Sequence, residues 1–319
     1  MSLALDEEQS DDNYRTLVER LSRQSVEKHF DAYADVDWDA PEMRIDPTDP
    51  RWEVLADDPL GSTEWYRSLP QDERARIGLH RVATAMKTGA QFESILKRGL
   101  LDYASALPNG SPEFRYIYHE VIEEAQHSLM FQEFVNRSGY DPRGLPWYLR
   151  LGSRFVVLTS RLFPPLFFLF VLGGEDPIDH TQRRALRSGA ESHPLLERIM
   201  RIHVTEEARH LSFARHYLKR TVPTLGPVRR LILSIAAPRL LWVMSRAMLM
   251  PSPGLLRQHG LPKGTLRRQV DRAEAQQYVK DSVAKVRRLC VELGLVTRVS
   301  KPIWKVSGLW DEPAREASR

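Results

Sequence analysis

The chain has 319 residues, of which 42% are hydrophobic and 28% charged, enough for one sizeable buried core. Its single cysteine, Cys290, excludes an internal disulfide and excludes zinc or iron–sulfur sites built from cysteine clusters. The formal net charge of +4 is a small excess, and without a recognised motif or stacking aromatics it argues against nucleic-acid binding.

The start of the chain and its apolar segments bear on where the protein works. Residues 1–13 are polar and acidic, so no secretion signal is expected, and the single cysteine fits a reducing, cytoplasmic location. Two segments, Phe155–Leu172 and Leu231–Met250, are apolar enough to be considered as membrane spans. Both contain arginine, and helices buried in a large bundle have the same composition. We therefore expect no membrane partner.

The first part of the chain combines one helix with an irregular segment. Asn13–Phe30 has helical periodicity, whereas Asp31–Pro59 is rich in Asp and Pro and is predicted as an extended loop or wrap-around arm. From Gln71 the pattern is strongly helical up to the turn at residues 108–110. A second strong helix is predicted to begin at Ser111 and to end before the break at Gly139–Pro146.

The remaining pattern is also helical, and no run alternates apolar and polar residues as a strand would. A very apolar helix is predicted over Ser153–Leu172. Residues 173–177, Gly-Gly-Glu-Asp-Pro, predict a break or kink there, with Asp176 capping a new helix. Further helices are predicted over His193–Arg220, Val228–Met250 and Leu266–Leu293. The sequence therefore indicates an all-α fold.

A short motif occurs twice in these helices, as Glu123–His127 (EEAQH) and Glu206–His210 (EEARH). Each copy places a glutamate and a histidine three positions apart, on one face of a helix. Two such Glu-x-x-His pairs, with one further glutamate from each of two other helices, form the dinuclear metal site of a four-helix bundle.

Four glutamates and three histidines lie on or beside the apolar stripes of the predicted helices. Along the chain the glutamates and the motif histidines follow the order Glu, Glu-x-x-His, Glu, Glu-x-x-His. An ionised carboxylate without a partner is costly to bury, so these positions need an explanation. Four glutamates and three neutral imidazoles match two divalent cations, and carboxylate with imidazole suits iron or manganese. A set of buried ion pairs with nearby Arg and Lys is the alternative. The predicted ligands are Glu93, Glu124, His127, Glu175, His203, Glu207 and His210.

The residues beside the ligands suggest supporting roles. Glu123 and Glu206 each precede a predicted ligand glutamate, where a carboxylate can accept a hydrogen bond from the far nitrogen of a ligand imidazole and fix its tautomer. Arg209 is placed to anchor one of these carboxylates. Exposed helix charges are the alternative for both glutamates.

With these motifs the chain resembles the ferritin-like non-haem di-iron oxygenases, and more narrowly the aureothin-type p-aminobenzoate N-oxygenase family. The narrower resemblance rests on a third histidine, in the run His203, Glu207, His210. It covers about Gln71–Tyr217 and implies a ferritin-like four-helix bundle there, to which the helical pattern of the sequence adds N- and C-terminal helices. Within one domain over residues 1–319, residues 1–70 would form an arm and helix, 71–220 the metal-binding bundle and 221–319 the additional helices.

The resemblance also implies ligand roles and an activity. Glu93, Glu124 and His127 would serve one iron, and Glu175 with His203, Glu207 and His210 the other, with Glu124 and Glu207 as bridging candidates. Two iron ions, with manganese as a substitute, would bind O2 and reduce it to a bridging peroxide that oxidises an aryl amine to hydroxylamine or nitro level, a reaction of secondary metabolism.

Other functions fit the same ligands. A di-iron hydroxylase or desaturase acting on C–H bonds, and a ferritin-like ferroxidase, remain alternatives.

The expected partners are a small amine substrate, an external electron donor (a ferredoxin or reductase) and, from the resemblance, a second copy of the chain. Basic residues after Lys219 form a solvated face or a docking surface for an acidic electron donor. Phe92, Phe131 and Met200 are candidates to line the substrate pocket, whereas no arginine stands out as a carboxylate clamp.

Overall fold

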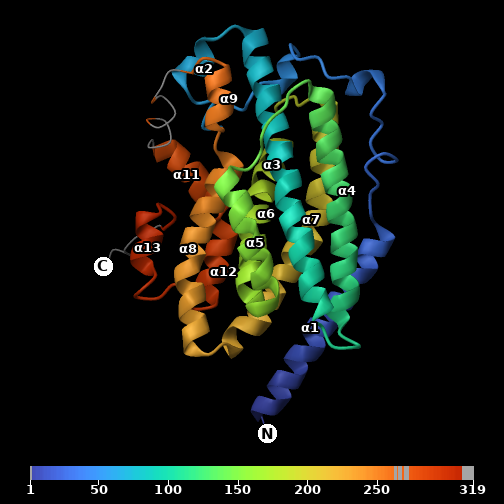
Figure 1. Cartoon of the computed structure of the whole chain (residues 1–319), viewed down its shortest axis with the longest axis vertical. Helices are drawn as coiled ribbons and strands as arrows, with labels where there is room; N and C mark the ends of the chain where they lie inside the picture. Colours follow the sequence, from blue (N-terminus) through green and yellow to red (C-terminus); the bar gives the residue numbers. More distant parts are fainter. Residues whose placement is uncertain (1, 262–263, 265–267, 269–272, 311–319) are drawn as a thin grey trace, which may run out of the picture.

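The computed structural model describes residues 2–261, 264, 268 and 273–310 (Figure 1). This part of the chain is all-α and has no strand, which confirms the predicted fold class. Its α-helices are α1 Ser2–Glu27, α2 Glu64–Ser68, α3 Gln71–Ser105, α4 Pro112–Ser138, α5 Trp147–Leu162, α6 Pro164–Arg187, α7 Pro194–Thr221, α8 Pro227–Leu249, α9 Pro253–Gln258, α11 Ala273–Ser282, α12 Ala284–Glu292 and α13 Lys301–Val306.

The centre of the molecule is a bundle of α3, α4, α6 and α7. α3 packs along α4 and α6 packs along α7, and the two pairs meet through α4 with α7 and α3 with α6. Short connections join the helices within each pair, whereas α5 carries the chain from the first pair to the second and packs on α3 and α6 (Figure 1). This is the arrangement that places one ligand-bearing face of each helix in a common interior.

The N-terminal segment covers one side of this bundle. α1 packs on α4 and α7 and ends at Glu27, before the predicted Phe30. The following arm contains two short 3₁₀ helices, Pro41–Met43 and Pro50–Trp52, the second of which packs on α3. Trp52 is only 2% exposed, so the arm belongs to the core instead of lying loosely over it.

The predicted helix over Ser153–Leu172 is wrong, because the structure has two helices that meet at Phe163, directly before the Pro164-Pro165 pair. Of the break or kink predicted at residues 173–177, the break is wrong, since α6 continues through these residues. A Cβ atom at Gly174 would lie 2.1 Å from the ring of Phe92, and one at Gly173 would lie 2.5 Å from Leu240. These glycines therefore allow close helix packing instead of ending the helix.

Asp176 does not cap a helix, as was predicted, because it lies inside α6. Its carboxylate is buried and pairs with Arg215 of α7, which ties the two helices together. Pro177 is tolerated within α6 although it removes one backbone donor.

The C-terminal helices pack mainly on α6. α8, α11 and α12 all contact it, so α6 packs against these helices as well as against α3, α5 and α7 (Figure 1). The single helix predicted over Leu266–Leu293 is instead divided into α11 and α12 where it is described; residues 265–267 and 269–272 lie outside the described part of the chain.

One helical stretch in the described residues is long and apolar enough to cross a membrane by length and composition alone. It covers Pro227–Gln258, which includes α8 and the short α9 after it; its most apolar window has a mean hydropathy of 1.4 and is 44% buried within the structure. Core helices of soluble proteins pass the same test. Of the other apolar segment, Phe167–Leu172 is buried, whereas Phe155, Leu158 and Leu162 of α5 are exposed.

Candidate metal centre

The bundle brings all seven predicted ligand side chains into one interior region. α3 supplies Glu93, α4 supplies Glu124 and His127, α6 supplies Glu175, and α7 supplies His203, Glu207 and His210. Each of them is at most 4% exposed. Seven ionisable side chains at this burial need partners other than water.

Glu124 lies between the histidines of the two repeated motifs. Its Oε1 is 2.9 Å from Nδ1 of His210, and its Oε2 is 3.5 Å from Nδ1 of His127. Glu207 approaches the same two nitrogens, at 3.5 Å from His210 Nδ1 and 3.9 Å from His127 Nδ1. The two carboxylates predicted to bridge therefore both face both imidazoles.

His203 reaches toward both halves of the site. Its Nε2 lies 3.9 Å from Glu93 Oε1 and 3.5 Å from Glu207 Oε1, and its ring centroid is 4.7 Å from that of His127. It is thus a member of the cluster and not an isolated core histidine. Its assignment to one particular ion stays a prediction.

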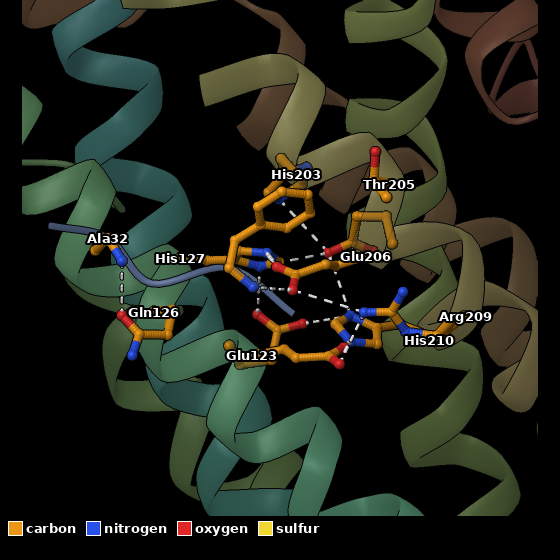
Figure 2. A network of polar contacts seen from close by, with 12 residues as sticks. Ala32, Glu123, Gln126, His127, His203, Thr205, Glu206, Arg209 and His210 are labelled. Atoms are coloured by element: carbon orange, nitrogen blue, oxygen red, sulfur yellow. Dashed lines mark hydrogen bonds and ion pairs between the residues drawn. The ribbon is translucent and has the colours of Figure 1, made fainter. Parts of the chain in front are cut away.

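The far nitrogens of the two motif histidines are held by glutamates on opposite helices (Figure 2). His127 Nε2 donates to Glu206 Oε2 at 2.8 Å, and His210 Nε2 donates to Glu123 Oε2 at 2.7 Å. Arg209 donates to Glu123 at 2.8 Å and lies 3.6 Å from Glu206. The hydrogen bonds predicted for the two glutamates are present, and they leave each Nδ1 lone pair facing inward.

The N-terminal arm is attached to this network, which the sequence did not indicate. The backbone N–H of Phe30 donates to Glu206 Oε1 at 3.1 Å. Ala32 N–H donates to Gln126 at 2.9 Å, and Gln126 donates in turn to Asp31 at 3.1 Å. The arm thus closes the side of the site where α4 and α7 meet (Figure 2).

Many atoms of the cluster make no hydrogen bond of ordinary geometry, although buried polar atoms in proteins are nearly always paired; the 2.9 Å contact between Glu124 Oε1 and His210 Nδ1 does not have that geometry either. The atoms without such a bond are both carboxylate oxygens of Glu124 and of Glu175, Oε2 of Glu207, and Nδ1 of His127, His203 and His210. Two groups, Glu93–His127–His203 and Glu124–His127–Glu207, have ligand atoms within 4.8 Å of one another. Oxygen and imidazole donors converging in this way fit a pair of divalent cations.

The pKa shifts differ across the metal-free cluster: glutamates raise the pKa of His127 and His210 despite their burial, whereas Glu93, Glu175 and His203 shift toward their neutral forms. Burial raises the pKa of Glu93 and of Glu175, and the neighbouring carboxylates raise both further. Burial, together with the charge of His127, lowers the pKa of His203. Neutral imidazole is the form that binds metal, and cations would offset the cost of ionising the buried carboxylates.

Glu120 is a buried acid near the site that the sequence analysis missed. It is 1% exposed, and burial raises its pKa to about 8, with Glu124 contributing and His210 opposing. The available signal was its position one turn before Glu124 on α4. Apolar Phe114 and Ile122 of α4 are 47% and 56% exposed, whereas Glu120 and Glu123 are buried, so the apolar residues of this helix do not mark its buried face.

Ser128 and Lys97 also support the ligands and were missed. Ser128 Oγ donates to Glu93 Oε2 at 2.9 Å, and Lys97 Nζ donates to Ser128 and to the backbone carbonyl of Glu124, the latter at 2.8 Å. These contacts fix the orientation of Glu93 between α3 and α4.

A cavity of about 910 Å³ leads to the cluster. Glu93, Glu175, His203 and Glu207 line one end of it, which makes this end reachable by a small molecule. The three side chains considered as pocket lining, Phe92, Phe131 and Met200, all line it.

Comparison with known proteins agrees with this geometry. The family model described as p-aminobenzoate N-oxygenase AurF matches residues 11–294. The chain belongs to this family. It is 40% identical over 309 residues to two uncharacterized proteins, Mb0909 of Mycobacterium bovis and Rv0885 of Mycobacterium tuberculosis. The similarity covers 97% of this chain and 91% of each relative. No solved structure matches the chain. Family membership makes the protein an oxygenase-family enzyme.

Proposed function

We propose that the protein is a non-haem di-iron oxygenase that uses O2 to oxygenate the nitrogen of an amine, from aryl amine toward hydroxylamine or nitro level. The observation that carries the proposal is the convergence of unpartnered carboxylate and imidazole atoms at the inner end of a cavity. The family supports an N-oxygenase in particular.

Two iron ions would be held by the seven side chains of the cluster, with manganese able to occupy the same donors. When bound, they would supply the activation of O2 that side chains alone do not provide. His127 and His210 would bind through Nδ1, because Glu206 and Glu123 hold the proton on each Nε2.

The chain's own residues would also control water and protons around the reacting amine. Phe92, Phe131 and Met200 present apolar surface beside the cluster and exclude water from the inner cavity. Glu120 is buried close to the ligand carboxylates, and burial raises its pKa to about 8 in the metal-free protein, so it would be the nearest further acid able to exchange a proton with the site. An external ferredoxin or reductase would supply electrons, and a homodimer remains the expected assembly.

The proposal is tested with protein loaded anaerobically with ferrous iron, then exposed to ¹⁸O2 and 4-aminobenzoate in the presence of a reductant. The expected result is a hydroxylamine or nitro product with ¹⁸O on nitrogen, dependent on iron bound at two ions per chain. Label on carbon would favour a hydroxylase instead. Iron oxidation without any labelled product from a panel of aryl and alkyl amines would favour a ferroxidase.

A further inference from the structure

Helix α5 has an apolar side that the described part of the chain leaves largely uncovered. Five large apolar side chains recur there at intervals of three or four positions, so they share one side of the helix. Each is at least 49% exposed. They are Trp147, Leu151, Phe155, Leu158 and Leu162. The apolar side of a helix is normally turned toward a core, so an exposed one of this length indicates a binding surface.

Arginines border this apolar stripe. Arg150, Arg154 and Arg161 are exposed, and each follows one of the apolar residues by three positions, which places it beside the stripe. Within the described residues no carboxylate pairs with them, and α5 contains no aspartate or glutamate. Aromatic and leucine side chains with arginines beside them, and no acid, are typical of a helix that lies in a membrane interface.

Helix α8 lies next to α5 and has the same character. Val156 of α5 and Met244 of α8 belong to one apolar cluster, and the guanidinium of Arg229 lies 5.7 Å from the ring centroid of Phe163 at the end of α5 (Figure 1). α8 also contains arginines and no acid. Its exposed large apolar side chains are Val228, Leu231, Ile232 and Trp242.

The exposed surfaces of the two helices meet at the cavity. Tyr148 of α5 and Trp242 of α8 are both exposed and both line it, so the cavity borders this surface. The stretch that contains α8 is apolar enough to span a membrane, yet only 44% of its most apolar window is buried. A helix of a protein core would be mostly buried, so much of this apolar surface is available to a partner.

Charge and composition together indicate what that partner is. A second copy bound through the same face would add further arginines and no acid to pair with them, because neither helix contains one. An acidic protein would pair with the arginines but offers little apolar surface to the exposed leucines and aromatic rings. The surface of an anionic bilayer provides phosphates for the arginines and acyl chains for the apolar side chains.

We propose that α5 and α8 form a membrane-binding face, which attaches the protein to the surface of a bilayer that contains anionic lipids without crossing it. Phe155 and its apolar neighbours enter the headgroup region, and the arginines beside them pair with lipid phosphates. This replaces the expectation from the sequence of no membrane partner, which considered spanning helices alone. The cavity that both helices line then lies beside the bilayer. The proposal does not rest on the proposed function.

Co-sedimentation of the full-length protein with sucrose-loaded vesicles tests the proposal. We expect binding to vesicles of equal parts phosphatidylcholine and phosphatidylglycerol, and at least about tenfold weaker binding to phosphatidylcholine alone. Phe155→Ser combined with Leu158→Ser should weaken binding to the mixed vesicles at least about tenfold. Arg150→Gln combined with Arg154→Gln should weaken it about 5- to 30-fold. Ile122→Ser, which changes an exposed apolar residue of α4, is the matched control and should bind as the wild type does.

The substituted side chains are exposed, so we expect each variant to fold, and circular dichroism checks this. A wild-type protein that does not bind the mixed vesicles, or two double variants that bind them as well as the wild type, overturns the proposal. Size-exclusion chromatography with light scattering identifies the other occupant. If the serine variant turns a dimer into a monomer and no form binds vesicles, the face holds a second copy instead.

Discussion

His127 of α4 donates its Nε2–H to Glu206 of α7 across 2.8 Å, so one copy of the repeated motif completes the other. The reverse pair, His210 to Glu123, repeats this relationship at 2.7 Å. A carboxylate behind a ligand imidazole fixes its tautomer and increases its basicity. The two motifs are therefore joined by a crossed arrangement of hydrogen bonds, in which the histidine of each motif depends on the glutamate of the other and both depend on the contact between α4 and α7.

Replacing Glu206 with Gln keeps the shape of this contact but removes the negative charge. We expect the affinity for ferrous iron to fall about 10- to 100-fold, with a similar loss for Glu123→Gln. Competition with a chelator of known affinity measures it. Glu133→Gln is the control and should bind iron normally, because Glu133 lies on α4 like Glu123 but pairs with Arg137 away from the metal site. Normal affinity in both buried variants would contradict the crossed arrangement.

His203 is expected to be needed for the reaction with O2. Its replacement by Ala removes the imidazole that reaches both Glu93 and Glu207, and the rate of ferrous oxidation by O2 should fall at least about tenfold. Stopped-flow absorption of iron-loaded protein gives this rate. His216→Ala, an exposed histidine of α7, should react as the wild type does. An unchanged rate in the His203 variant would remove it from the ligand set.

The sequence was sufficient to predict the bundle and to select the side chains that gather inside it. Glu93, Glu124 and Glu207 could be selected because spacing along a helix determines which side chains share a face. Contacts between helices could not be predicted, since they depend on how each helix is rotated about its axis. Glu120 shows this, because the apolar residues of α4 do not mark its buried face.

The glycines of α6 show a second limit. Gly-Gly followed by Pro is typical of a chain break, and local propensity alone predicts one. In the structure the same glycines admit Phe92 and Leu240, and the packing of α6 against its neighbours keeps the helix continuous. Tertiary packing overrides the local signal, and one sequence without its neighbours in space does not reveal that.

Glu120 should make the stability of the metal-free protein depend on pH. Its folded pKa of about 8 lies above the ordinary value of 4.5, so the folded state binds more protons between these values and loses stability as the pH rises. The loss is up to about 1.4 kcal/mol per pH unit. Urea unfolding at pH 5, 6.5 and 8 should show a flatter dependence for Glu120→Gln, and an unaltered slope for the surface variant Glu133→Gln. Parallel curves for wild type and Glu120→Gln would contradict the assignment.

Gly174 is expected to tolerate no side chain. A Cβ atom there would lie 2.1 Å from Phe92, whose ring is 3% exposed and packs at 5.1 Å from that of Phe170, so it has little room to move. Gly174→Ala should lower the free energy of unfolding by about 1–3 kcal/mol, the usual cost of overpacking. Gly152→Ala on α5 meets no atom within 4 Å and should raise the free energy of unfolding by up to about 1 kcal/mol, because alanine favours a helix. Chemical denaturation of both variants gives the comparison, and a Gly174→Ala protein as stable as Gly152→Ala would mean that α6 and α3 are less closely packed than the structure shows.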